Sequence, residues 1–365
     1  MPNFAPEELE QHAVGIFKAA GASAKEALIV GRHLVEANLA GHDSHGVLRI
    51  PQYVEAIRRG KVKVGTQPEI VTETATTAVL DGRNGFGQVI AHEAMALAIR
   101  KARGSGIAAV TARNSNHTGR LASYTKMAAA EGLVAMMMVN AGGGGQSVVP
   151  FGGLARRLAT NPISIAAPSG NGVPVVLDIA SSVAPEGKVR LLYQARKPAP
   201  PGWLIDSAGR TSTDPKDFYE SPGGGLLPLG GPAGYKGFGL AFMIDILAGA
   251  LSGAGCCRPG APEALDGFLM LTVDVQKFTP IHLFCHHVAL LADHVKSCPP
   301  APGFDEVYVP GEVELREEKR RKLEGIPVDD VIWREIEAIA VELGLGASAG
   351  GKVLGPGDPS VSKVK

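Results

Sequence analysis

The sequence has no excess of charge of either sign and very few cysteines. Its 365 residues include 36 basic and 36 acidic side chains, so no bulk electric field attracts nucleic acid or anionic lipid. The four cysteines, at positions 256, 257, 285 and 298, form no CxxC pair and no even framework. Disulfides are therefore not expected, and free thiols indicate a reducing, cytoplasmic location.

Signals for secretion or membrane insertion are also missing. The first ten residues are acidic and lack the basic, then apolar layout of a signal peptide. The most apolar long window, 237–257, contains Asp245 and many glycine, alanine and serine residues, which favours a buried helix over a membrane span. We expect neither a membrane nor a nucleic acid among the partners.

Established nucleotide- and metal-binding patterns are absent as well. The glycine-rich segments 81–87 and 141–145 do not have the GxGxxG order, and Gly187-Lys188 lacks the upstream glycine of a P-loop. These segments are interpreted as tight turns, so a conventional Rossmann site is not expected. Histidines and cysteines at 42, 45, 256, 257, 286 and 287 do not have zinc-site spacing, and no metal is predicted.

The most informative segment that is present covers residues 38–53. It places His45, Arg49 and Tyr53 four residues apart. If a helix begins near Ser44, successive members rotate by only about 40°, and all three share one face. That face would offer an imidazole for proton transfer, a guanidinium for a carboxylate, and a phenol. The pattern predicts a site for a small carboxylic acid that reacts at the neighbouring carbon.

Three other positions carry candidate ligand-binding groups, each with a simpler structural explanation. Segment 114–120 lies between a predicted strand and a predicted helix, where free N–H groups and Arg120 could hold a phosphate beside His117. An ordinary polar N-cap loop explains that segment equally well. Asp178 ends an apolar strand, where it can face a ligand or merely cap the strand. Lys236 lies at the start of an apolar helix. It can help to bind an anion at the helix N-terminus, or its side chain can simply extend into solvent.

The periodicity predicts a helical opening followed by mixed strands and helices. Helix 6–21 ends at a glycine, and the next helix begins with a Ser23–Glu26 capping box. The other helices are expected at 44–59, 88–103, 121–131, 236–252, 283–297, 312–323 and 328–343, and the strands at 69–74, 77–80, 107–111, 133–139, 163–167, 173–177 and 268–273. The proline-rich stretch 195–234 shows no sustained period and is interpreted as an irregular excursion or lid.

Ordered blocks over nearly the whole chain, to about residue 343, resemble the type 2 malate/L-lactate dehydrogenase family. The blocks are Asp43-Ser44-His45-Gly46, Gly85-Phe86-Gly87-Gln88, Asn114-Ser115-Asn116-His117, Pro150-Phe151-Gly152-Gly153, Thr160-Asn161-Pro162, Leu177-Asp178-Ile179-Ala180, Lys236-Gly237 and Pro310-Gly311-Glu312. Residues 37–43, 119–120 and 220–222 are most similar to the hydroxycarboxylate dehydrogenase B branch. The resemblance implies a non-Rossmann α/β fold, with a largely antiparallel sheet core, surrounding helices, a helical N-terminal segment and a homodimeric assembly.

The resemblance also implies roles for individual residues. His45 would exchange the proton with the keto oxygen, using a pKa near neutrality, and Ser44 and Asp178 would assist it. The substrate would contact Arg49, Tyr53, His117 and Thr160. The cofactor, NAD or NADP, would contact His45, Gly119, Arg120, Leu121, Val176, Leu177, Asp178, Ile179, Ala180, Tyr235, Lys236, Asp266, Gly311, Glu312, Val313 and Glu314.

The implied division has a helical segment, 1–66, packed with C-terminal helices, 311–345. Residues 67–310 would form the sheet-containing domain that binds cofactor and substrate, and the tail 346–365 is expected to be disordered.

Several positions depart from the family pattern. The loop 141–149 is about three residues longer, Tyr235 replaces a common histidine, Asp266 replaces a common asparagine, and Lys188 stands where some relatives carry an acid.

The expected activity is the NAD(P)H-dependent interconversion of 2-oxo and 2-hydroxy carboxylates. A cyclic imino acid reductase acting on piperideine- or pyrroline-2-carboxylate is the alternative within the family. A non-catalytic ligand-binding dimer is the alternative from another class, and a metal hydrolase is a third interpretation. The departures at 188, 235 and 266 are the only sequence feature that favours the non-catalytic dimer.

Overall fold

The centre of the fold is a seven-stranded sheet with strand order β2-β3-β4-β11-β5-β6-β7. The computed structural model describes residues 2–141, 143–261 and 265–346. Only the β3–β4 pair is parallel, so the prediction of a largely antiparallel sheet is confirmed. The strands are β2 (Glu69–Glu73), β3 (Thr77–Asp81), β4 (Ile107–Ser115), β5 (Leu133–Asn140), β6 (Ile163–Ala167), β7 (Val175–Ile179) and β11 (Asp266–Asp274).

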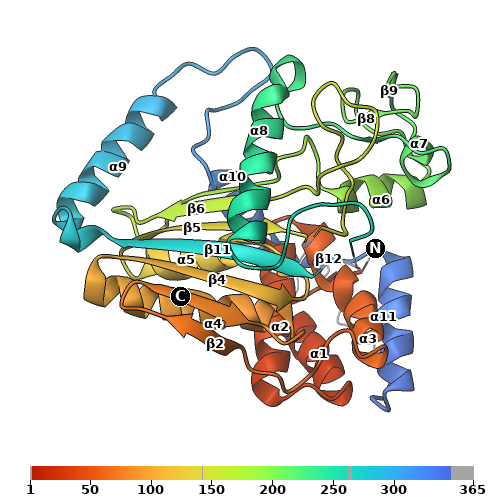
Figure 1. Cartoon of the computed structure of the whole chain (residues 1–365), viewed down its shortest axis with the longest axis horizontal. Helices are drawn as coiled ribbons and strands as arrows, with labels where there is room; N and C mark the ends of the chain where they lie inside the picture. Colours follow the sequence, from red (N-terminus) through yellow and green to blue (C-terminus); the bar gives the residue numbers. More distant parts are fainter. Residues whose placement is uncertain (1, 142, 262–264, 347–365) are drawn as a thin grey trace.

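Helices cover both faces of this sheet (Figure 1). On one face lie α4 (Gly87–Ser105) and α5 (Ala122–Ala130), and α8 (Tyr235–Ile244) crosses the other. Side chains alternate between the two faces along a strand. Phe268 and Met270 of β11 accordingly join the buried cluster beneath α4, while Leu269 joins the cluster beneath α8.

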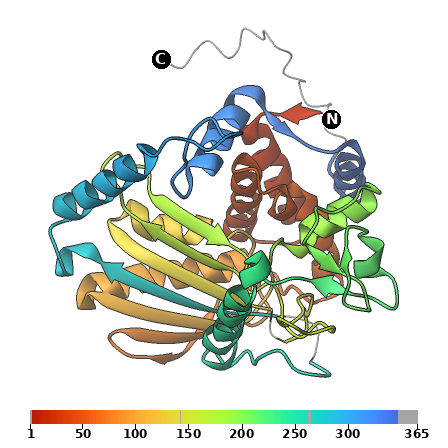
Figure 2. The same cartoon turned by 90° about the horizontal axis from the view of Figure 1, so that it is seen from above.

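The N-terminal helices form a separate apolar cluster with a C-terminal helix. The helices are α1 (Pro6–Ala19), α2 (Ala24–Leu39), α3 (Ile50–Arg58) and α11 (Asp330–Glu342). The predicted capping box is present, since Ser23 and Glu26 exchange both hydrogen bonds. The N-terminal segment also pairs with a C-terminal segment, because β1 (Asn3–Phe4) lies antiparallel to β12 (Ile326–Pro327). Figure 2 shows this helical group beside the sheet.

The stretch predicted as irregular has structure of its own, which corrects that interpretation. It contains a three-stranded sheet in the order β10-β8-β9 and the short helix α7. The elements are β8 (Leu204–Ile205), β9 (Thr211–Ser212), α7 (Lys216–Tyr219) and β10 (Gly225–Leu226), and helix α6 (Glu186–Gln194) directly precedes the stretch. Leu204, Phe218 and Leu226 are buried in a cluster of this region. Strands of two residues are too short to produce a detectable sequence period.

Two apolar helices have large exposed faces. The predicted buried helix consists of α8 and a π-helical turn, Asp245–Ala250. It is only half covered, since Phe242 is 52% exposed and Met243 is 50% exposed. Helix α9 (Ile281–Lys296) contains no buried residue and lies at the edge of the molecule (Figure 1). Among the described residues, no helix combines the length and apolarity needed to span a membrane.

Helix α10 (Glu312–Glu324) precedes α11 in the chain and packs on α2. The expected disordered tail, apart from residue 346, lies outside the described residues.

Candidate active site

The segment that carries the candidate catalytic residues is not one helix, which corrects the prediction for 44–59. Two 3-10 turns, Asp43–His45 and Val47–Arg49, precede α3, which begins at Ile50. Asn38 interrupts the helix, because its side-chain oxygen accepts the N–H of Val47 at 2.8 Å. A Cβ at Gly46 would lie 2.2 Å from that oxygen, so only glycine fits between the two turns.

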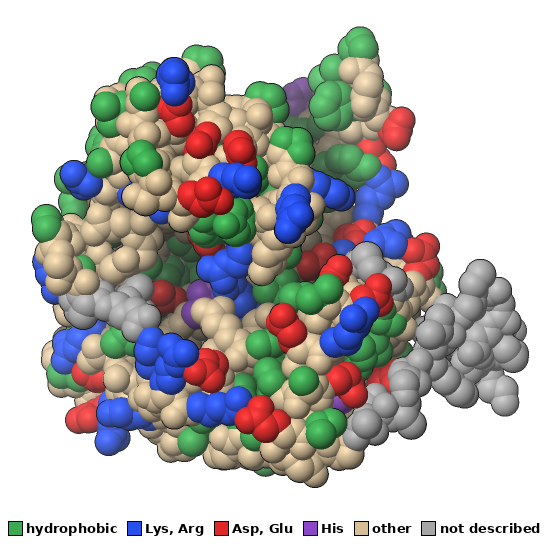
Figure 3. All heavy atoms as spheres, turned by 90° about the vertical axis from the view of Figure 1, so that its right-hand side faces the viewer, with side chains coloured by type: hydrophobic (Ala, Val, Ile, Leu, Met, Phe, Trp, Pro, Cys, Tyr) green, Lys and Arg blue, Asp and Glu red, His purple; other side chains and the backbone are tan. Residues whose placement is uncertain are grey.

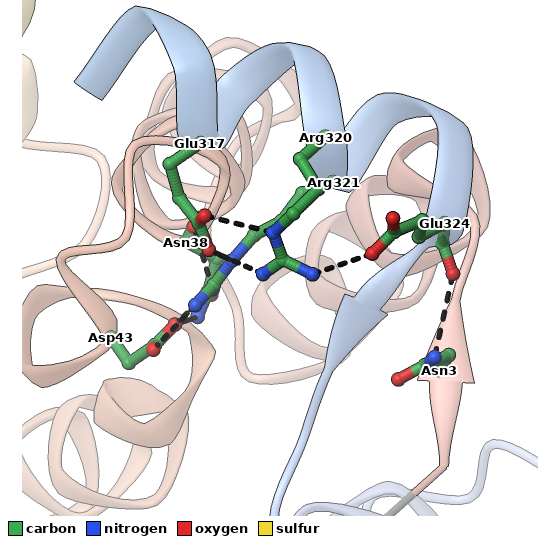
Figure 4. A network of polar contacts seen from close by, with 7 residues as sticks. All are labelled: Asn3, Asn38, Asp43, Glu317, Arg320, Arg321 and Glu324. Atoms are coloured by element: carbon green, nitrogen blue, oxygen red, sulfur yellow. Dashed lines mark hydrogen bonds and ion pairs between the residues drawn. The ribbon is translucent and has the colours of Figure 1, made fainter. Parts of the chain in front are cut away.

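A second contact, from the far end of the chain, holds the same turns (Figure 4). Arg321 of α10 donates to both carboxylate oxygens of Asp43, at 2.6 and 3.0 Å, and to the backbone oxygen of Asn38 at 2.8 Å. Asn38 also donates to Asp43 at 2.6 Å. We call this group of three residues the Asp43 clasp. It fixes the backbone immediately before His45.

The Asp43 clasp gives a stability prediction. Arg321→Met is expected to lower the free energy of unfolding by about 1–3 kcal/mol, because a nearly buried charge-assisted donor is lost. Urea denaturation measures the change. The matched control is Arg320→Met, whose exposed guanidinium pairs with Glu317 and Glu324 and should change stability by less than about 1 kcal/mol. Equal losses in both variants would contradict the assigned role of the clasp.

The three predicted side chains still meet, through His117 rather than along a helix face. The rings of His45 and His117 are stacked, with centroids 5.5 Å apart. Nδ1 of His45 lies 3.1 Å from the hydroxyl of Ser44, and the Tyr53 hydroxyl lies 2.7 Å from Nδ1 of His117. Arg49 donates from Nε to the backbone oxygen of Ser44 at 2.7 Å. Residues from two distant segments therefore form one polar group.

Gln88 completes the hydrogen-bond chain to His117. Its amide nitrogen donates to the Tyr53 hydroxyl at 2.8 Å, which leaves the phenol proton for Nδ1 of His117. In this assignment His117 carries its own proton on Nε2. Burial raises the pKa of Tyr53 to about 12, so the phenol remains a donor at neutral pH.

Arg49 is a buried cation without a carboxylate partner among the described residues. Only 9% of it is exposed, and its other side-chain hydrogen bond goes to the neutral Gln52, at 2.6 Å. Burial lowers its pKa, although a guanidinium stays charged. The first turn of α6 closes over it, since a Cβ at Gly187 would lie 3.4 Å from Nη2. A buried positive charge of this kind favours binding of an anion.

Burial and positive neighbours keep the histidine pair neutral. Burial lowers the pKa of His45 to about 3, and repulsion from Arg49 adds to the shift. Burial, with Arg49 again contributing, lowers the pKa of His117 well below its ordinary value. The expectation of a near-neutral pKa for His45 is therefore wrong for the protein without ligand. Figure 3 shows a hollow on this side of the molecule where basic and histidine side chains meet.

Segments predicted to hold the cofactor converge on one small cavity. Arg120, Val176, Asp178, Gly311 and Glu314 all line a cavity of about 30 Å³. The Asp178 carboxylate accepts the backbone N–H of Ala122 in α5 at 2.8 Å and lies 4.0 Å from Nε of Arg120. Burial raises the pKa of Asp178. The cavity shares four lining residues, Val173, Pro174, Gly311 and Leu315, with a groove of about 880 Å³ along α9.

Two features of this cavity fit a phosphate-containing dinucleotide. Nε of Arg120 is buried and has no hydrogen-bond partner in the described part of the chain, so it is available to an anionic ligand. Gly311 has a φ of +94°, and a Cβ there would lie 3.3 Å from the backbone nitrogen of Val176. The backbone can therefore approach a ligand closely at this point.

The remaining predicted residues occupy several places. Gly119 lies against His33, which accepts the N–H of Arg120 at 2.9 Å. Asp266 accepts from the backbone and hydroxyl of Thr118, next to His117. The other residues near the cavity are Leu121 at the start of α5, Leu177, Ile179 and Ala180 on or after β7, and Glu312 and Val313 at the start of α10. Thr160 accepts from Ser181.

Two predicted cofactor residues are not brought to this group. Tyr235 and Lys236 are exposed at the start of α8, and Tyr235 contacts Phe151 instead. Lys188 is exposed on α6. Within the described ranges, no cluster of three or more histidine, cysteine, aspartate or glutamate side chains is arranged to bind a metal.

Sequence reasoning missed three residues that shape the site: His33, Gln88 and Arg321. Gln88 stood inside a family block, but its role depends on contact with Tyr53, 35 residues away. His33 appeared as a lone histidine in an apolar helix, a pattern that gives no signal of its own.

The chain is similar to known dehydrogenases over most of its length. The family model described as Malate/L-lactate dehydrogenase matches residues 4–337. The chain is 36% identical to malate dehydrogenase of Pyrococcus abyssi, covering 93% of this chain and 94% of that one. It is 37% identical to hydroxycarboxylate dehydrogenase B of Escherichia coli K12, covering 94% of each. The solved malate dehydrogenase of Pyrococcus horikoshii aligns with a TM-score of 0.85 at 33% identity, covering 94% of this chain and 96% of that chain.

Proposed function

This chain belongs to the malate/L-lactate dehydrogenase family, and we propose that it interconverts 2-oxo and 2-hydroxy carboxylates with NAD or NADP. The observation that carries the proposal is the buried guanidinium of Arg49, which has no carboxylate partner among the described residues and lies beside the histidine pair. Such a cation can bind the substrate carboxylate and present the adjacent carbonyl to His45.

We assign the proton transfer to His45. The nicotinamide, when bound, supplies the hydride for the carbonyl carbon. His45 supplies the proton for the carbonyl oxygen, and Ser44 orients its ring through Nδ1. His117, fixed by Tyr53 and Gln88, offers a second hydrogen-bond donor in the same stack.

Substrate binding also prepares His45 for this role. Arg49 is the second-largest cause of the lowered pKa of His45, after burial. A carboxylate bound to Arg49 cancels that repulsion and adds a negative neighbour, so it raises the pKa of His45. The imidazole therefore binds a proton more readily when the acid is bound.

The cofactor would be held by Arg120, Asp178 and the backbone at Gly311. Nε of Arg120, which has no hydrogen bond among the described residues and lies 4.0 Å from the Asp178 carboxylate, fits a phosphate oxygen, and the Asp178 carboxylate fits a ribose hydroxyl. The groove beside this cavity, about 880 Å³ in volume, offers space for the rest of the dinucleotide.

The direct test is a panel of substrates with both cofactors. Oxidation of NADH and NADPH is followed with pyruvate, phenylpyruvate, oxaloacetate and a cyclic imino acid. Turnover of the oxo acids supports the proposal and shows which cofactor is used. Turnover of the imino acid alone would favour the imine reductase. Binding of the cofactor without turnover of any of these substrates would favour a non-catalytic protein.

Arg49 gives a sharper prediction. Arg49→Met is expected to reduce kcat/KM for the preferred oxo acid about 10- to 150-fold, mainly through KM, because the charged hydrogen bonds to the carboxylate are lost. Steady-state kinetics measures this, and the Kd for NADH should stay unchanged. The matched control is Arg59→Met, at the C-terminal end of the helix α3 that follows Arg49, where the exposed guanidinium pairs with Glu55. An unchanged KM in Arg49→Met would remove the guanidinium from substrate binding.

We also propose that two copies associate through the exposed faces of α8 and α9. Phe242, Met243, Leu290 and Leu291 are each at least half exposed, and large apolar side chains exposed together on a helix favour an interface. Light scattering tests the assembly, and a particle with the mass of one 37.8 kDa chain would contradict it. The four cysteines are free, which supports our proposal of a reducing, cytoplasmic location.

A further inference from the structure

Asp266 is a buried carboxyl group at the start of β11 that the proposed reaction does not use. One of its oxygens, Oδ2, accepts the backbone N–H of Thr118 at 2.9 Å and the hydroxyl of the same residue at 3.1 Å. The other oxygen, Oδ1, has no partner among the described residues, and no described cation forms an ion pair with the carboxyl group. An unpaired buried carboxyl of this kind is costly unless it has a function.

Asp266 is bound to the loop that connects the histidine pair, His45 and His117, with the cofactor cavity at Arg120. Thr118 directly follows His117, whose ring stacks on His45, and it directly precedes Gly119 and Arg120 of the cofactor cavity. A dinucleotide that contacts Arg120 and presents its reactive ring to His45 must pass along this loop. The carboxyl of Asp266 is therefore hydrogen-bonded to the loop that joins the histidine pair to the cofactor cavity.

We propose that Asp266 is a charge switch that selects the oxidation state of the bound nicotinamide. When ionised, its carboxylate favours the oxidised ring, which carries a positive charge. When protonated, it favours the neutral, reduced ring, since a buried negative charge is then absent. The inference rests on the proposed function, and the switch needs only the exchange of one proton with solvent.

The switch operates near neutral pH. Burial raises the pKa of Asp266 to about 7, against the opposing effect of its hydrogen bonds from Thr118. Groups that face it from neighbouring elements do not titrate in this range. The pKa of Tyr53, from α3, is about 12, that of Tyr124, from α5, is well above 10, and that of His117 is well below 6.5.

The strands beside Asp266 present no titratable group to it. Its partners in the sheet are Ser115 of β4 and, one residue along, Asn140 of β5. Arg49 and Arg120 belong to the same site but form no ion pair with Asp266. A change in cofactor preference between pH 6 and pH 8 therefore reports on Asp266.

The test measures Kd values for NAD⁺ and NADH, or for the NADP pair if that is the cofactor used, by titration calorimetry at pH 6 and pH 8. Ionisation favours the oxidised form and protonation favours the reduced form. In the wild type we therefore expect the ratio of Kd for the oxidised form to Kd for the reduced form to fall at least about tenfold as pH rises. Asp266→Asn keeps an oxygen for Thr118 but loses the charge, so its ratio should not change with pH.

A matched control lies at the other end of the same strand. Asp274→Asn replaces a buried carboxylate that accepts from Gln276 and pairs with Arg103, and it should keep the pH dependence of the wild type. If Asp266→Asn does not fold, Thr118→Val provides a second variant. This variant loses one hydrogen bond to the ionised carboxylate of Asp266, which should raise the pKa of that group. The pH at which the ratio of the two Kd values is halfway through its change should therefore be higher than in the wild type.

The possible failures are distinguishable. A wild-type pH dependence retained in Asp266→Asn, or an unmoved midpoint in Thr118→Val, overturns the charge switch and leaves the proposed reaction intact. A wild type that binds neither cofactor form overturns the proposed function itself.

Discussion

His45→Ala is expected to lower kcat about 10²- to 10⁴-fold, the usual range for the loss of a general acid–base group. The Kd for NADH should change little, because the cavity of Arg120, Asp178 and Gly311 is left intact. Single-turnover reduction of a 2-oxo acid measures the rate, and fluorescence titration measures the Kd. His294→Ala, on the exposed last turn of α9, is the control.

The pH profile separates proton transfer from a merely structural role. If His45 is charged only when a carboxylate is bound to Arg49, the kcat of the wild type should fall as pH rises above the raised pKa of the complex. In His45→Ala this limb of the profile should disappear. Full activity in the variant, or an unchanged pH profile, would assign the proton transfer to another group.

The second large effect is loss of stability in acid. Burial is the first cause that lowers the pKa of three histidines: to about 3 for His33 and for His45, and well below 6.5 for His117. In the unfolded chain these side chains bind protons near pH 6.5. Between about pH 6.5 and pH 4 the unfolded state therefore binds three protons that the folded state does not.

Asp266 acts in the opposite direction. Its pKa is raised to about 7, so the folded state binds one proton that the unfolded chain takes up only below about pH 4. The balance of three protons against one leaves two in favour of the unfolded state. Stability should then fall by up to about 3 kcal/mol per pH unit as pH drops from 6 toward 4. The raised pKa values of Glu36 and Asp178 moderate the slope in the lower part of this window, whereas the pKa of His12, also lowered by burial, makes the slope steeper.

Urea denaturation at pH 6.5, 5.5 and 4.5 measures this slope. His33→Gln removes one of the three histidines and keeps an acceptor for the N–H of Arg120, so its slope should be smaller by up to about 1.4 kcal/mol per pH unit. His294→Gln, which changes an exposed ring, should keep the wild-type slope. A stability that stays flat down to pH 4.5 would show that the buried histidines take up protons in the folded state.

The sequence predicted the partners of the site better than their local conformation. The spacing of His45, Arg49 and Tyr53 indicated a common group, and the structure brings them together around His117. The continuous helix was wrong because the side chain of Asn38 bonds to Val47, nine residues later. Helical periodicity contains no information about such a competing hydrogen bond.

Long-range contacts limited the rest of the prediction. The Arg321–Asp43 contact joins residues 278 positions apart, and nothing in either local segment marks the partner. The apolar window at α8 indicated burial, but pattern alone cannot say whether the cover comes from the same chain. The sheet was predictable because β5, β6 and β11 have long apolar runs bounded by turns, whereas the two-residue strands β8 to β10 do not.

The Asp43 clasp has a consequence for how the protein is made. Arg321 contacts the backbone of Asn38 and the side chain of Asp43 just before His45, so the proposed proton-transfer residue gains this support only after residue 321 has been synthesised. A nascent or prematurely terminated chain can form the sheet and the histidine stack in part, but it lacks the guanidinium that fixes the loop. The proposed activity should therefore depend on synthesis of the chain through α10, which carries Arg321.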